Sequence, residues 1–106
     1  MVDLRKKLRS GMVGVILGER HLVLTDCETE HYGSQSICFI NATGFMTGSS
    51  YDENLNHRNK EFSINALYRP TVDGLTYSMT YKDKDLIWTR YPKNLKELII
   101  SRRFLK

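Results

Sequence analysis

Histidine, cysteine and acidic residues are the side chains of this sequence that could bind a metal or act as a catalytic base. Cys27, His31 and Cys38 form the set closest to a group of zinc ligands. Structural zinc sites use ligand pairs at short spacing, and neither cysteine has such a neighbour. The same residues could supply a cysteine–histidine nucleophile, but Cys38 lies in an apolar run that is typical of a buried thiol. We therefore expect no metal site and no cofactor.

Neither paired carboxylates nor glycine-rich loops in this sequence point to a catalytic site. Asp83 and Asp85 alternate with two lysines in a charged turn, which is typical of solvated side chains rather than of a general acid and base. The sequence contains no phosphate-binding glycine loop, no dinucleotide fingerprint and no zinc-protease motif. These observations predict a protein that is not an enzyme.

Aromatic residues beside arginines are a more useful signal. Arg69 directly follows Tyr68, and Arg90 lies between Trp88 and Tyr91. A guanidinium group next to a ring can stack on a nucleobase and neutralise its phosphate. On alternating strands about half of the rings point inward, so we expect Trp88 to be mainly a core residue.

The polar stretch 49–60 is the longest connection in the sequence and has two interpretations. Loops of this kind hold binding residues more often than strand interiors do. Alternatively, the stretch is an Asx-type or Ser-type turn whose tyrosine plugs the core. The candidate ligand-binding residues of the whole chain are Tyr51, Asn54, Arg58, Tyr68, Arg69 and Arg90.

The 106 residues carry a net charge of +4, and this charge is unevenly placed. Residues 1–10 carry +3 and residues 90–106 carry +5, whereas residues 11–89 carry −4. The length is that of a single domain, 1–106, with basic ends around its body. If the ends meet, they form a basic face that could bind nucleic acid, nucleotide phosphates or an acidic protein. The alternative is a solvated surface that keeps the chain soluble.

Short runs rich in β-branched and alternating apolar residues predict a mostly β protein. We expect strands at Met12–Leu17, His21–Thr25, Ser36–Ile40, Thr43–Gly48, Glu61–Tyr68, Leu75–Tyr81 and Asp85–Arg90. Asp26–Gly33 is polar and is expected to be a loop, and Leu4–Leu8 is expected to form a helical turn. The spacing of Leu95, Leu98 and Ile99 favours a short helix, although Ile99 and Ile100 also suit a strand. These elements predict a small single-domain antiparallel sheet, an SH3-like half-open barrel with one or two short helices.

Targeting signals are missing from the sequence as given. No apolar run is long enough to span a membrane, and the first residues lack the apolar core of a secretory signal. We expect a cytoplasmic protein with reduced thiols, although a bridge between Cys27 and Cys38 stays open. A half-open sheet leaves free edges, so we predict at least a dimer.

Several motifs follow one another in a distinctive order. They are Ser10–Val13, His21–Leu24, Gly48–Leu55, Phe62–Pro70 and Leu86–Arg90. In order and approximate spacing, residues 3–90 resemble short, largely uncharacterised accessory proteins of bacteriophages and prophages from Gram-positive bacteria. Gly14, where a valine is usual, and the tail after residue 94 depart from that pattern.

The resemblance implies a small phage-encoded accessory protein without enzymatic activity that acts in the host cytoplasm against a host defence. We expect it to sequester a nucleotide signal, held by arginines and aromatic rings at a subunit interface. One alternative is an inhibitor that binds a host defence protein, such as a nuclease, through the basic face. Another is a small nucleic-acid-binding barrel, which steep salt dependence of duplex binding would reveal.

Overall fold

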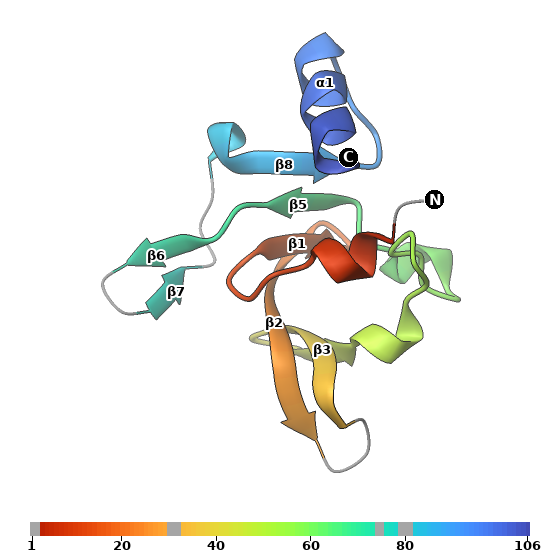
Figure 1. Cartoon of the computed structure of the whole chain (residues 1–106), viewed down its shortest axis with the longest axis vertical. Coiled ribbons are helices and arrows are strands. Elements are labelled where there is room, and N and C mark those ends of the chain that lie inside the picture. Colours follow the sequence, from red (N-terminus) through yellow and green to blue (C-terminus); the bar gives the residue numbers. More distant parts are fainter. Residues whose placement is uncertain (1–2, 30–32, 74–75, 79–81) are drawn as a thin grey trace.

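The computed structural model describes residues 3–29, 33–73, 76–78 and 82–106, and it describes their side chains except over 26–36 and 72–81 (Figure 1). The strands are β1 (Val13–Ile16), β2 (Glu19–Thr29), β3 (Gly33–Asn41), β4 (Gly44–Thr47), β5 (Ala66–Tyr68), β6 (Thr71–Asp73), β7 (Thr76–Ser78) and β8 (Leu86–Thr89). The helices are the 3-10 turns η1 (Leu4–Lys7), η2 (Gly48–Ser50), η3 (Lys60–Phe62) and η4 (Asp83–Asp85), and the α-helix α1 (Leu95–Phe104).

Six strands form one antiparallel sheet in the order β4-β3-β2-β1-β5-β8. β1 to β4 follow one another as a meander, and β5 then returns to the other side of β1. Val13 therefore faces Leu22 on one side and Tyr68 on the other. The outermost strands β4 and β8 do not pair with each other, so the sheet made by the described strands is open. The mostly β, antiparallel class expected from the sequence is confirmed.

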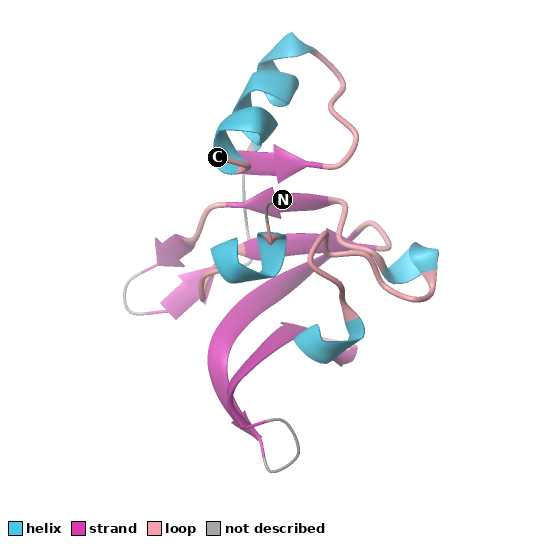
Figure 2. Ribbon diagram, turned by 45° about the vertical axis from the view of Figure 1, so that its right-hand side comes forward, coloured by secondary structure: helices cyan, strands magenta, loops and turns pink. Residues whose placement is uncertain are grey.

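The long strand β2 connects the two halves of the sheet. It pairs with β1 through Glu19–Leu22 and with β3 from Leu22 to Thr29. Two register shifts interrupt the second pairing beyond Leu24, and bulges of this kind bend and twist a strand. Figure 2 shows β2 as the long curved strand that runs from the upper strands down to β3. This curvature encloses the core without closing the sheet.

A two-residue turn, Leu17–Gly18, joins β1 to β2 in an antiparallel hairpin. Leu17 and Gly18 have φ angles of 55° and 74°. Positive φ at both central positions is the geometry that matches the twist of a hairpin, and glycine adopts it without steric cost.

The core lies between the curved sheet, η1 and the connection from β4 to β5. Trp88 is buried, as expected from the sequence. The core cluster contains Leu4, Leu8, Met12, Ile16, Val23, Phe39, Tyr51, Leu55, Ile64, Leu67 and Trp88.

Three sequence predictions need correction or cannot be tested. The loop expected at Asp26–Gly33 is wrong at both ends, because β2 extends to Thr29 and β3 begins at Gly33, and residues 30–32 lie outside the described part of the chain. The strand expected at Glu61–Tyr68 is restricted to β5, because the Asn59 side chain accepts the Glu61 amide and starts η3 instead. The expected strand Leu75–Tyr81 is represented by β7, which pairs with β6 in a separate sheet. The side chains of this expected strand, like that of Cys27, lie outside the described part of the structure.

The C-terminal helix α1 covers the outer edge of β8. Asn94 caps the helix by accepting the Glu97 amide at 2.9 Å. The buried Ser101 hydroxyl accepts the Thr89 amide at 3.0 Å, which satisfies an edge-strand donor. Covering an edge in this way protects it from pairing with other chains.

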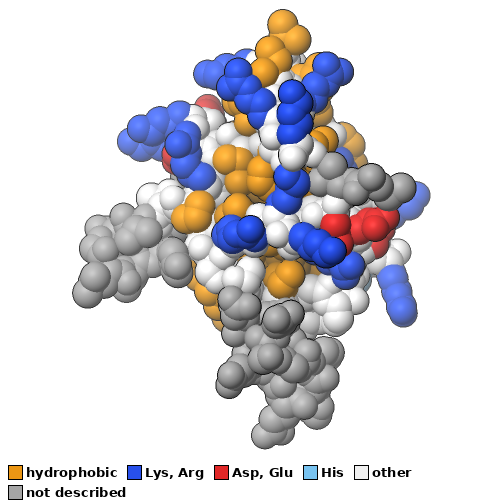
Figure 3. All heavy atoms as spheres, in the orientation of Figure 1, with side chains coloured by type: hydrophobic (Ala, Val, Ile, Leu, Met, Phe, Trp, Pro, Cys, Tyr) orange, Lys and Arg blue, Asp and Glu red, His pale blue; other side chains and the backbone are white. Residues whose placement is uncertain are grey.

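The two basic ends of the chain meet beside α1. The Lys7 ammonium lies 5.7 Å from the centre of the Phe104 ring. Figure 3 shows lysine and arginine side chains gathered over η1 and α1 on this face. Many cations therefore share one surface, although they come from opposite ends of the sequence.

Candidate ligand groove

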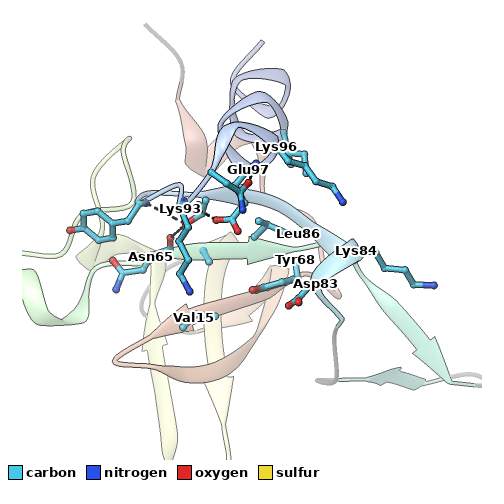
Figure 4. A pocket seen from close by; sticks show the side chains of 14 residues that line it. Val15, Asn65, Tyr68, Asp83, Lys84, Leu86, Lys93, Lys96 and Glu97 are labelled. Atoms are coloured by element: carbon cyan, nitrogen blue, oxygen red, sulfur yellow. Dashed lines mark hydrogen bonds between the residues drawn. The ribbon is translucent and has the colours of Figure 1, made fainter.

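A groove of about 680 Å³ lies where α1 and the loop before it meet β5 and β8 (Figure 4). Its floor is formed by sheet residues, and its walls by η4 and the first turns of α1. The lining residues are Val15, Asn65, Ala66, Tyr68, Asp83, Lys84, Leu86, Thr89, Tyr91, Lys93, Asn94, Lys96, Glu97 and Ile100.

Three exposed lysines line this groove. Lys84 comes from η4, whereas Lys93 and Lys96 flank the N-terminus of α1. Figure 4 shows Lys93 extending across the groove in front of the sheet, while Lys84 and Lys96 point outward on one side. Within the described part of the chain, the two ion pairs join other residues, so none of these ammonium groups is neutralised by a carboxylate.

Two carboxylates share the groove with the lysines. Glu97 is already engaged, because its side chain accepts the Lys93 amide at 3.1 Å as part of the helix cap. Asp83 is exposed on η4 at the opposite wall. The lining therefore has more positive than negative groups, with acceptors for hydroxyl groups nearby.

The floor of the groove combines a ring with small apolar side chains. Tyr68 is half-buried on β5, next to Ala66 and opposite Leu86. Tyr91 is 69% exposed at the rim. A ring system with attached phosphates could place its flat part on such a floor and its charges near the lysines.

Of the six predicted ligand-binding residues, Tyr68 lies in the groove and Arg69 supports its wall. The Arg69 guanidinium donates to the Lys84 carbonyl at 2.5 Å and pairs with the Asp85 carboxylate at 3.3 Å. These contacts hold η4, and with it Lys84, beside β5.

Asn54 and Arg90 are brought together, but neither lines the groove. The Arg90 guanidinium donates to the carbonyls of Asn54 and Ile64, both at 2.9 Å, and lies 5.2 Å from the Trp88 ring. Burial lowers the pKa of Arg90, although Tyr91 and Asp52 act in the opposite direction. Arg90 thus fastens the 51–65 connection to β8.

Tyr51 is a core residue of that connection. It is 2% exposed, and its hydroxyl donates to the Phe62 carbonyl at 2.7 Å. Its ring makes edge contacts with Phe39 and His57. Burial raises the pKa of Tyr51 to about 12.

The rest of the 49–60 loop has the geometry of the Asx-type alternative. The Asp52 carboxylate accepts the amides of Asn54 and Asn56, both at 2.9 Å. Arg58 is exposed on this loop. The structure therefore places a plug and a turn here, apart from the groove residues.

Sequence reasoning missed the three groove lysines. Their signal was present as the basic C-terminal segment and the charged turn before β8, but neither pattern shows that the two meet. Comparisons with protein-family models, curated proteins and solved structures found no match for this chain.

Metal and membrane features were also sought. Across the described ranges, no three histidine, cysteine or acidic side chains lie close enough to hold a metal ion. The Cys27 side chain and the whole of His31 lie outside what the structure describes. None of the described helices is long and apolar enough to cross a membrane.

Proposed function

We propose that this protein is a binding protein without catalytic activity, and that it holds a phosphate-bearing nucleotide in the groove between α1 and β8. The observation that carries the proposal is that one groove, with Tyr68 on its floor, is lined by three lysines that make no ion pairs among the described residues, Lys84, Lys93 and Lys96. Ammonium groups bind phosphate oxygens by charge-assisted hydrogen bonds. A tyrosine ring on the floor supplies a stacking surface for a base.

The fold supports a finer assignment within this proposal. We assign the sheet to the SH3-like half-open barrels, because β5 returns to β1 beside a four-stranded meander and β2 bends between both halves. The helix α1 is then an addition to the barrel that builds one wall of the groove.

The biological role in this proposal is sequestration of a nucleotide signal by a phage accessory protein. The support for that role is the sequence resemblance together with a groove lined by cations. A second chain could enclose the ligand, and the position of β4 at the end of the sheet made by the described strands supports the predicted dimer. A sedimentation mass of one chain at micromolar concentration would contradict the dimer.

The proposal is tested by nucleotide titration with ATP, cyclic di-AMP and cyclic ADP-ribose as probes. At least one probe is expected to bind the natural chain. Replacing Lys84, Lys93 and Lys96 by glutamine should weaken that binding at least about tenfold, since charged hydrogen bonds are lost.

A matched control distinguishes the loss of groove lysines from the loss of net positive charge. Lys6, Lys60 and Lys106 are exposed and do not line the groove. Replacing these three by glutamine removes the same charge and should leave affinity within about threefold, because exposed distant charges are screened. Equal loss in both variants, or no binding of any probe, would overturn the proposal.

A further inference from the structure

The outer side of α1 carries apolar and basic side chains in a definite arrangement. Leu95 is 70% exposed and Ile99 is 42% exposed, and Arg102 and Arg103 follow them and are also exposed. At 3.6 residues per turn, these four side chains fall within an arc of about 100°. We call them the outer stripe of α1.

Contacts on the opposite side of α1 hold the outer stripe away from the sheet. Ser101 is buried and bonded to Thr89, and Phe104 and Leu105 pack against the core cluster. Rotating the helix to bury Leu95 and Ile99 would break these contacts. The outer stripe is thus held outward on a helix fixed to β8.

Cations extend the basic end of the outer stripe. Lys106 follows the helix, and Lys7 of η1 lies over the Phe104 ring. The outer stripe is therefore apolar at Leu95 and Ile99 and strongly basic at its C-terminal end, and the exposed Lys96 lies beside its apolar part. The groove does not include any residue of the outer stripe.

We infer that the outer stripe of α1 docks onto an acidic segment of a partner protein, one that presents large apolar side chains beside carboxylates. Charge complementarity favours this partner, and Leu95 and Ile99 supply apolar anchors one helical turn apart. Nucleic acid would pair with the arginines but would leave the aliphatic anchors unused. A second copy would oppose like charges, and two aliphatic anchors are few for a membrane surface.

The test is selection of short random peptides displayed on a surface, with the whole chain as bait. Enriched peptides should combine aspartate or glutamate with large apolar residues. Leu95→Ser with Ile99→Ser should weaken a selected peptide by about tenfold or more, as expected for central anchors. Arg102→Gln with Arg103→Gln should weaken it similarly and flatten its salt dependence.

Controls distinguish a loss of peptide binding at the outer stripe from unfolding and from damage to the nucleotide groove. Phe45→Ser alters another exposed apolar residue, 66% exposed on β4, and should leave peptide affinity unchanged. Both stripe variants should keep the melting temperature and the nucleotide affinity of the natural chain. The inference would be overturned if the selected peptides lacked acidic residues or bound both stripe variants as tightly as the natural chain. Binding of duplex DNA or anionic vesicles through the outer stripe would overturn it as well.

Discussion

The Thr89 amide donates a hydrogen bond to the Ser101 hydroxyl at 3.0 Å, and this contact joins the last strand of the sheet to the C-terminal helix. It satisfies an amide at the edge of β8 and fixes the helix that forms one wall of the groove. The position of Lys93 and Lys96 relative to Tyr68 therefore depends on it.

Ser101→Ala should destabilise the protein by about 1–3 kcal/mol, because the Thr89 amide loses its acceptor in a partly buried place. Equilibrium unfolding in urea measures the loss. Ser50→Ala, at an exposed serine of η2, is the control and should change stability by less than about 0.5 kcal/mol. Equal effects of the two substitutions would show that the bond does not hold α1.

Arg90→Lys should destabilise the chain by about 1–3 kcal/mol, because an ammonium cannot replace a guanidinium that contacts two carbonyls and a ring. Hydrogen exchange should show the largest gain at 54–64, the segment that Arg90 fastens. Arg58→Lys is the matched exposed control and should leave both measurements unchanged. Faster exchange elsewhere, with 54–64 unaffected, would contradict this role.

Stability should fall as the pH rises from about 10 to about 12, since burial holds the pKa of Tyr51 near 12 and the unfolded side chain titrates near 10. Over this range the unfolded state binds fewer protons than the folded state, so deprotonation favours unfolding. Below pH 10 this contribution is fully present. Unfolding measured across this range with Tyr51→Phe isolates the effect, because the variant lacks the titrating group. An identical pH dependence in both chains would refute it.

Gly48→Ala should destabilise the chain by about 1–3 kcal/mol through overpacking. A methyl group there would lie 2.8 Å from the Ile37 Cβ and 3.2 Å from the Ile37 carbonyl oxygen. Thermal unfolding tests this expectation, with Ser50→Ala, at an exposed serine of the same turn, as its control. A melting temperature equal to that of the control would mean that β3 can move away from η2 at no cost.

Patterns in the sequence predicted the elements that are stabilised by contacts between residues close together in the chain. The spacing of Leu95, Leu98 and Ile99 predicts a helix, and α1 forms there. The polar composition of Asp26–Gly33 concealed the extension of β2 and β3, because strand pairing there is set by the partner strand. The alternation of apolar and polar residues over Glu61–Tyr68 wrongly predicted a strand from residue 61, because Asn59 caps the 3-10 turn η3 there.

The candidate groove could not be predicted in the same way. Lys84 and Lys96 line the same groove because Ser101 docks α1 on β8 and Arg69 holds η4 beside β5. Neither contact has a short-range pattern in the sequence. Tyr68 was named as a candidate because a ring beside an arginine is visible in the sequence, and it lines the groove, whereas Arg69 supports the wall.

The most direct test of the nucleotide groove is an NMR titration of the isotope-labelled chain with the nucleotide that binds best among the three probes. The proposed site predicts amide shift changes concentrated at Tyr68, Lys84 and Lys93–Glu97, with the 54–60 loop and Arg102–Arg103 unchanged. Shift changes confined to the 54–60 loop or to Arg102–Arg103, with the groove residues unmoved, would contradict it.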